Sequence, residues 1–178
     1  QAPYRDVPTQ AKYDDAFVEL VGWYWTEGTA GPGRRITLSQ SERVNPSKTA
    51  RIRNALTKLY GHEQRNVHKG RVVGPPTWKE TTYSGNVVFV LSVAAAESLR
   101  EVVIGKEKIV DADFIRSLTH AQLELFIDVS LQADGHRNTI GQASEQRIRA
   151  FEMACILAGK TPRTRAYEDR GWSCRILQ

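Results

Sequence analysis

The chain has 178 residues, 40% of them hydrophobic, which is enough for one substantial core or for two small repeats that share an interface. Its 25 Lys and Arg outnumber its 20 Asp and Glu and give a net charge of +5, which favours a polyanionic partner. The longest apolar stretch, Val87 to Leu91 and then Val93 to Ala96, is too short to span a bilayer, so no membrane association is expected. Cys155 and Cys174 lack a CxxC spacing and are predicted to be reduced, as in a cytoplasmic or nuclear protein.

The first half of the chain begins with an apolar helical stretch that runs from Phe17 and ends at Glu27, which is followed by Gly28. Hydrophobic periodicity and turn residues then predict a series of strands and helices for the rest of this half. The segments after Gly28 are a strand at 34–40, a helix at 48–60 capped by Gly61, strand-like stretches at 70–73, 78–83 and 86–91, and a helix at 94–104.

A polar connector at 105–114 leads to a second half that begins in the same way. Its predicted segments are a helix at 118–133 that leads into Asp134 and Gly135, a strand at 137–142, a helix at 144–158, and strands at 163–167 and 172–177. The sequence stops before the final helix that a full repeat would have. We place the first repeat at 1–104, a linker at 105–117 and the second repeat at 118–178.

The two halves share one order of features: an apolar helix, an acid-Gly pair, a polar strand that ends in Gln, a helix with Arg-Ile-Arg, and a glycine cap. The strand-end residues are Gln40 and Gln142, and the caps are Gly61 and Gly159. Five matching features in one order indicate an internal repeat. The sequence therefore predicts an α+β fold of two pseudo-symmetric αββαββα repeats, each with an antiparallel sheet.

Small residues spaced about one turn apart predict that the two acid-tipped helices pack closely. These residues are Gly22 and Thr26 in the first helix, and Val129 or Ser130 with Ala133 in the second. Close packing would bring Glu27 and Asp134 together. An acid at a helix C-terminus opposes the macrodipole, and a bound cation would reverse that penalty.

The segments Leu20-Val-Gly-Trp-Tyr-Trp-Thr-Glu-Gly28 and Ile127-Asp-Val-Ser-Leu-Gln-Ala-Asp-Gly135 resemble the two LAGLIDADG motifs of a single-chain homing endonuclease. The connector from Lys106 resembles the lysine-bearing block that precedes the second motif in intein endonuclease domains. The resemblance covers residues 11–177. The second motif has Val129 where glycine is usual, which is expected to open the helix seam slightly.

This resemblance implies site-specific cleavage of double-stranded DNA by a monomer with Mg²⁺, for which Mn²⁺ would substitute. It implies metal ligation by the carboxylates of Glu27 and Asp134, helped by the backbone carbonyls of Thr26 and Ala133. Gln40 and Gln142 match the strand-end residues that orient active-site water. A lysine would polarise that water, and Lys108 is preferred over the alternatives Lys106 and Lys79.

DNA recognition would belong to the strands, because a curved β-ribbon can enter the major groove with alternate side chains facing the bases. The candidate side chains are Arg, Lys, Thr and Ser on these strands. They are Arg34, Arg35, Thr37, Ser39, Arg71, Lys79, Thr81, Arg137, Thr139, Arg163, Arg165, Ser173 and Arg175.

A non-cleaving nucleic-acid binder on the same scaffold, such as an RNA maturase or a transcription regulator, is the alternative function. Retention of both acids favours cleavage, because a pure binder would suffer their repulsion of phosphate. A structural protein that binds no nucleic acid is a third and more distant interpretation. Whether the chain is the endonuclease part of an intein, intron-encoded or free-standing stays open, and so does its target sequence.

Overall fold

The computed structural model describes residues 7–30, 32–63, 76–167 and 171–177. The predicted strand at 70–73 and the candidate Arg71 lie outside these ranges. The first repeat contains α1 (Asp15–Glu27), β1 (Thr29–Ala30), the 3₁₀ turn η1 (Pro32–Arg34), β2 (Ile36–Gln40), α2 (Pro46–Tyr60), β3 (Trp78–Tyr83), β4 (Asn86–Leu91) and α3 (Val93–Val102). Its antiparallel sheet has the strand order β1-β2-β4-β3.

A small hairpin and a short helix connect the repeats: β5 (Val103–Ile104), β6 (Ile109–Val110) and α4 (Ala112–Arg116). The second repeat contains α5 (His120–Asp134), β7 (Gly135–His136), β8 (Thr139–Gln142), α6 (Glu145–Leu157), β9 (Thr161–Tyr167) and β10 (Gly171–Leu177). Its antiparallel sheet has the order β7-β8-β10-β9, which repeats the order of the first sheet element by element.

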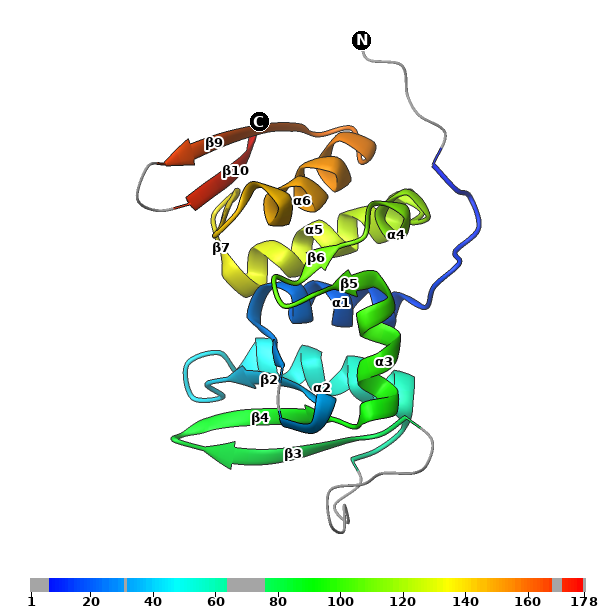
Figure 1. The fold of residues 1–178 in the computed structure, drawn as a ribbon, viewed down its shortest axis with the longest axis vertical. Coiled ribbons are helices and arrows are strands. Elements are labelled where there is room, and N and C mark those ends of the chain that lie inside the picture. The colour runs from blue at the N-terminus through cyan, green and yellow to red at the C-terminus, as the bar shows by residue number, and fades with distance from the viewer. Residues whose placement is uncertain (1–6, 31, 64–75, 168–170, 178) are drawn as a thin grey trace.

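The two repeats meet through α1 and α5, which lie side by side in the middle of the molecule, while the two sheets lie toward opposite ends (Figure 1). The helices α2 and α6 pack on the outer sides of α1 and α5. The buried core is continuous through both repeats and includes Trp25, Phe89, Phe126 and Phe151. The predicted α+β fold of two pseudo-symmetric repeats is therefore confirmed.

Side-chain caps fix where the central helices begin. The carboxylate of Asp14 accepts a hydrogen bond from the backbone N–H of Ala16 at 2.8 Å at the start of α1. Thr119 and Gln122 form a reciprocal capping box at the start of α5. Gln122 is buried and also donates to the carbonyl of Tyr13 and to Asp15, so one amide ties the starts of α1 and α5 together.

The seam between α1 and α5 is tight because Gly22 makes room for Val129. A Cβ atom at Gly22 would lie 2.7 Å from Cγ1 of Val129, well inside van der Waals contact. Trp25 crosses the same seam, stacks on Phe126 and donates from Nε1 to the Ser130 hydroxyl at 3.0 Å. The valine that was expected to open the seam is thus accommodated by the glycine opposite it.

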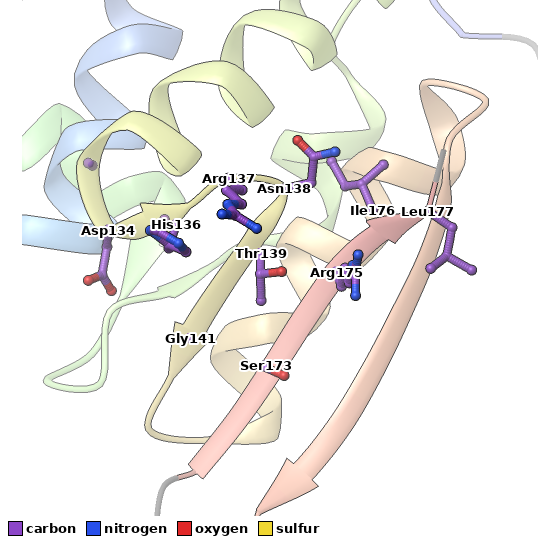
Figure 2. Close-up of a pocket in the computed structure, with 12 residues that line it drawn as sticks. Asp134, His136, Arg137, Asn138, Thr139, Gly141, Ser173, Arg175, Ile176 and Leu177 are labelled. Atoms are coloured by element: carbon purple, nitrogen blue, oxygen red, sulfur yellow. The ribbon is translucent and has the colours of Figure 1, made fainter.

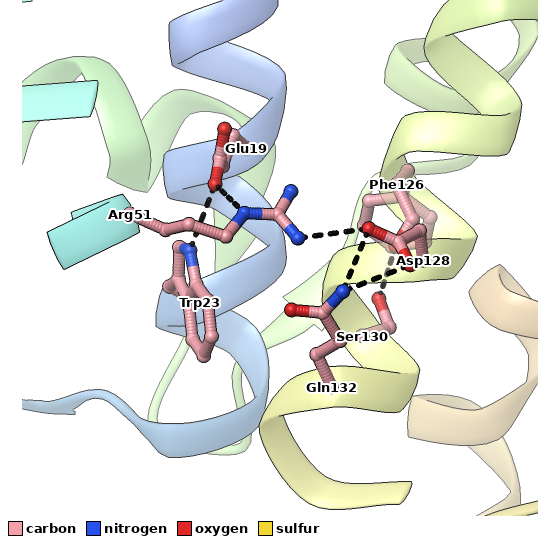
Figure 3. Close-up of polar contacts among 7 residues, drawn as sticks. All are labelled: Glu19, Trp23, Arg51, Phe126, Asp128, Ser130 and Gln132. Carbon is pink, nitrogen blue, oxygen red and sulfur yellow. Dashed lines mark hydrogen bonds and ion pairs between the residues drawn. The ribbon is translucent and has the colours of Figure 1, made fainter. Parts of the chain in front are cut away.

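A polar network on one side of the seam joins three helices (Figure 3). Arg51 of α2 donates from Nε to Glu19 of α1 at 2.7 Å and from Nη1 to Asp128 of α5 at 2.9 Å. The carboxylate of Asp128 also accepts from Gln132, one turn further along α5. One guanidinium thereby links the first repeat to the second, away from the helix tips.

Several predicted boundaries were wrong, two of them for a backbone reason. The first predicted strand begins at Ile36 and not at residue 34, because Gly33 and Arg34 have left-handed φ values of 66° and 64°, which no strand accommodates. The strand predicted at 137–142 begins at Thr139, because Arg137 (φ 56°) turns the chain between β7 and β8. The helix predicted at 94–104 ends at Val102, and Val103 and Ile104 form β5.

The connector is also more structured than predicted, since it contains the β5–β6 hairpin and α4. Phe114 and Ile115 of α4 are fully buried, so this segment adds to the core that the repeats share. None of the helices that the structure describes is long and apolar enough to cross a membrane.

Candidate active site

The two acid-Gly pairs lie at the C-terminal ends of α1 and α5. Each helix ends at its acid, and the next glycine donates its N–H back to the last turn. A Cβ atom at Gly28 would lie 2.7 Å from the carbonyl oxygen of Tyr24, and one at Gly135 would lie 2.4 Å from that of Leu131. Glycine is therefore required where the chain leaves each helix, and the sharp turn there leaves both carboxylates at the helix tips.

Both carboxyl groups have raised pKa values. Partial burial is the main cause for Glu27, and the charge of Asp134 raises the pKa of Glu27 further. Partial burial also raises the pKa of Asp134. Because the charge of Asp134 reaches Glu27, and the charges of Lys48 and Lys108 act on both carboxyl groups, the structure brings the two predicted acids into one electrostatic site.

The strand-end glutamines each contact the acid of their own repeat. Gln142 of β8 donates from Nε2 to Oδ2 of Asp134 at 3.0 Å, and a side-chain hydrogen bond from Gln40 of β2 lowers the pKa of Glu27. Both glutamines are buried, at 7% and 6% exposed. A buried amide held against a carboxylate fixes the orientation of that carboxylate.

Lys108 reaches the same site from the β5–β6 turn. Its backbone is left-handed (φ 55°), and its Nζ donates to the carbonyl of Gly28 at 2.6 Å and to that of Thr26 at 3.4 Å. Burial and the neighbouring Arg147 lower the pKa of Lys108 to about 8, although both acids oppose this shift. Among the residues that the structure describes, neither Lys106 nor Lys79 contributes to the electrostatics of Glu27 or Asp134.

Two further cations at the site were missed by the sequence analysis. Lys48 of α2 donates from Nζ to the carbonyl of Ala133 at 3.3 Å, and Arg147 of α6 donates from Nη2 to the carbonyl of Trp25 at 2.5 Å. Each therefore reaches across the seam to the motif helix of the other repeat. Lys48 lowers the pKa of Glu27, and Arg147 lowers that of Asp134.

The sequence contains a pattern that identifies this pair, but the two repeats were matched at the wrong positions. Lys48 and Arg147 are each the third residue of the helix that follows a Gln-ended strand. The repeated Arg-Ile-Arg letters instead matched Arg51 with Arg147, although Arg51 belongs to the network of Figure 3 and not to this site. A basic residue at the third helical position in both repeats would have identified the correct alignment.

The donor atoms fit a hard divalent cation. Two carboxylates and nearby backbone carbonyls are the oxygen ligands that Mg²⁺ accepts, with water and phosphate completing its coordination. The carbonyls of Thr26 and Ala133, which were predicted as ligands, accept hydrogen bonds from Lys108 and Lys48. Within the described residues no cluster of three or more His, Cys, Asp or Glu side chains is found, so a protein-only metal cage is not present there.

An open groove leads from Asp134 along the outer face of the second sheet (Figure 2). Its lining includes His136, Arg137, Thr139, Ser173 and Arg175. Four of the predicted DNA-contacting residues thus line a surface that is continuous with one of the two acids.

Strand register places most predicted DNA-contacting residues on the outer faces of the sheets. In the first sheet two cross-strand rows face outward, Thr37–Val90–Lys79 and Ser39–Val88–Thr81. In the second sheet the corresponding rows are Thr139–Arg175–Arg163 and Gly141–Ser173–Arg165. Arg35 precedes β2 on the face of Thr37.

Arg34 departs from the prediction. It lies in η1, where its guanidinium pairs with Glu97 of α3 at 2.8 Å. Its carbonyl also accepts a hydrogen bond from Arg100. Arg34 therefore links η1 to α3 within the first repeat.

These features define a class: a two-repeat α+β protein with paired carboxylates at the tips of adjacent helices and a sheet on either side. The sequence matches no protein-family model and no curated protein. Solved structures do match. The homing endonuclease I-DmoI, in complex with DNA and Mn, has a TM-score of 0.60 at 12% identity over 92% of this chain and 89% of that one.

Two other matches have lower TM-scores. The homing endonuclease I-WcaI, bound to its DNA recognition sequence, has a TM-score of 0.52 at 9% identity over 94% of this chain and 77% of that one. Full-length DUF199/WhiA from Thermotoga maritima has a TM-score of 0.54 at 11% identity over 97% of this chain and 54% of that one. The chain has the fold of the LAGLIDADG homing endonucleases, as predicted.

Proposed function

We propose that this chain is a site-specific endonuclease that hydrolyses phosphodiester bonds in both strands of DNA with Mg²⁺, and that it starts the homing of its own gene. The observation that carries the proposal is the pair Glu27 and Asp134, held at adjacent helix tips and surrounded by Lys48, Lys108 and Arg147. Such a site offers oxygen ligands for a cation and positive charge for a phosphate. The metals in the solved neighbours, Mn and Ca, support a divalent cation.

The residues of the chain have distinct roles in this proposal. Glu27 and Asp134 are the metal ligands, assisted by the carbonyls of Thr26 and Ala133, while Gln40 and Gln142 hold the carboxylates and orient water. When bound, the divalent cation supplies an activated water and neutralises charge at the leaving oxygen.

The three cations stabilise the negative charge of the phosphate. Lys108 is the residue best suited to polarise the attacking water, because its lowered pKa lets Nζ hold a proton loosely near neutral pH. Arg147 has a buried Nε without a hydrogen-bond partner among the described residues. This N–H group is suited to donate to an anionic ligand.

A non-cleaving binder is the competing function. It is disfavoured because the two acids would repel phosphate and contribute nothing to binding without a metal. We further propose that the protein acts as a monomer, since one chain supplies both acids and both sheets. Duplex DNA is the proposed partner.

The test is selection of cleaved sites from a randomised DNA pool with Mg²⁺ or Mn²⁺, followed by substitution of the acids. Glu27→Gln and Asp134→Asn are each expected to reduce cleavage of the selected site at least about 100-fold while leaving its binding unchanged. Rates come from single-turnover cleavage and affinities from gel shift in Ca²⁺. Glu101→Gln, an exposed acid on α3, is the matched control and should cut normally. Normal cutting by both acid variants would exclude this metal site.

A further inference from the structure

The two sheets present chemically different surfaces at corresponding positions. The register matches Val90 of β4 with Arg175 of β10 and Thr81 of β3 with Arg165 of β9, because the outward rows of the two sheets align. The central strand of the first sheet thus places apolar Val88 and Val90 outward. The second sheet has Ser173 and Arg175 at those places.

The arginines of the second sheet are free to meet a ligand. Arg163, Arg165 and Arg175 are exposed, and none of their guanidinium groups forms an ion pair or hydrogen bond with any residue that the structure describes. Arg137, at the β7–β8 turn, is in the same state and lines the groove of Figure 2. Because these donors have no partner among the described residues, their hydrogen-bonding capacity faces outward.

Two arginines around the first sheet are instead occupied within the protein, while the guanidinium of Arg35 has no ion pair or hydrogen bond with any described residue. Arg34 pairs with Glu97, and Arg53 pairs with Glu80 and Glu42. The outward face there offers Thr37, Ser39, Thr81 and the partly exposed methyl groups of Val88 and Val90, with Arg35 and Lys79 along one edge. The centre of this surface makes apolar contacts and weak hydrogen bonds.

In the major groove these two surfaces suit different bases. Arginine makes bidentate hydrogen bonds to O6 and N7 of guanine, whereas apolar side chains and threonine contact the C5-methyl group of thymine. The geometry points to an asymmetric DNA target: the half-site beneath the second sheet carries guanines read by Arg163, Arg165 and Arg175, and the half-site beneath the first carries thymines read by Val88 and Val90. This inference rests on the proposed function in requiring DNA in the major groove at both sheets.

The test begins with the full chain and a randomised duplex pool selected for binding in Ca²⁺, so that it does not depend on cleavage. In the enriched sequence, deoxyuridine replaces thymidine in one half-site at a time to remove the methyl group. In parallel, 7-deazaguanine replaces guanine to remove N7. We expect about 4-fold weaker binding for each contacted methyl group and at least about 5-fold weaker binding for each contacted N7, in opposite half-sites.

Two substitutions assign each half-site to its sheet. Val90→Ala should reduce the sensitivity to deoxyuridine at the thymine that Val90 contacts and leave the sensitivity to 7-deazaguanine unchanged. Arg175→Gln should remove the sensitivity to 7-deazaguanine at the guanine that Arg175 contacts and leave the sensitivity to deoxyuridine unchanged. Arg149→Gln, an exposed arginine on α6 outside the sheet, is the control and should change neither. Circular dichroism and thermal melting verify that each variant is folded.

The outcomes separate this inference from the proposed function. Enriched half-sites of similar composition, or tight binding that is unaffected by both base analogues, would overturn the asymmetric readout while leaving DNA recognition intact. Uniform weakening of all sequences by Arg175→Gln, with a shallower salt dependence, would show that Arg175 contacts phosphate and would also overturn it. Failure to enrich any sequence would reject sequence-specific DNA recognition itself.

Discussion

The two repeats have the same elements in the same order, yet they use their charged residues differently. In the first repeat a helix-to-strand tie is formed by Arg53 of α2 and Glu80 of β3, at 2.8 Å. At the corresponding positions of the second repeat, Glu152 of α6 accepts a hydrogen bond from Thr164 of β9 at 2.8 Å. The contact between helix and strand in the second repeat therefore involves no arginine.

A repeat can therefore keep its fold while the residues on its surface diverge. Thr164 holds β9 onto α6 from the inner face, and strand alternation puts Arg163 and Arg165 on the outer face. The helix tips diverge less, because both repeats keep an acid, a strand-end glutamine and a cation at the third position of the following helix. Fold and site are thus held in common, while the outer faces differ.

The largest expected effect comes from the two crossing cations. Lys48→Met and Arg147→Met should each slow cleavage roughly 100-fold, because each removes a donor aimed into the site. Lys48 is the strongest charge on Glu27, although it also acts on Asp134, and Arg147 is the strongest charge on Asp134, so the two variants should accumulate DNA nicked in opposite strands. Denaturing gels with each strand end-labelled separately measure this.

The control for the crossing cations is Lys58→Met, an exposed lysine in the last turn of α2, which should cut both strands normally. Nicking of the same strand by both cation variants would contradict the pairing of one cation with one acid.

A middle-sized effect is expected at the seam, where the two motif helices are unequal. Gly22→Ala places a methyl group 2.7 Å from Val129 and should lower the free energy of unfolding by about 1–3 kcal/mol. The double variant with Val129→Ala should recover part of that loss, because the methyl group then has space. Urea unfolding of the two single variants and the double variant gives the coupling energy. Additive losses would show that Gly22 and Val129 do not share this space.

The smallest effect concerns the helix-to-strand ties and depends on pH. Hydrogen bonding to Arg53 lowers the pKa of Glu80 from its ordinary value of 4.5. A carboxylate whose pKa is lowered in the folded protein stabilises it above the unfolded pKa, and this contribution is lost as pH falls through the folded pKa. Glu80→Gln should therefore cost less than about 1 kcal/mol at neutral pH and still less in acid.

Thermal unfolding of wild type and Glu80→Gln at several pH values below neutral measures that difference. Thr164→Val is the matched variant in the second repeat, where the tie is a hydroxyl donor and should cost about 1 kcal/mol. A wild-type advantage over Glu80→Gln that grows as the pH falls would contradict the role of the Arg53–Glu80 pair.

Much of the fold followed from local patterns. Alternation placed β2, β4 and β10 close to their observed bounds, and helical periodicity placed α1, α2, α5 and α6. Two of the boundary errors occurred at Arg34 and Arg137, because a left-handed non-glycine residue gives no compositional signal. The two-residue strands β1 and β7 were too short for any alternation to be visible.

The repeat, the two acids and the two strand-end glutamines were predicted from local patterns, because periodicity and capping fix where each helix ends. The cations that meet those acids, and the arginines left without a partner among the described residues, depend on the tertiary fold. A charged side chain pairs with groups that lie close to it in space. Lys48 and Arg147 contact backbone carbonyls across a seam between segments that are far apart in the chain. The same reason separates Arg51, which ties three helices together, from Arg175, which faces outward beside Arg163.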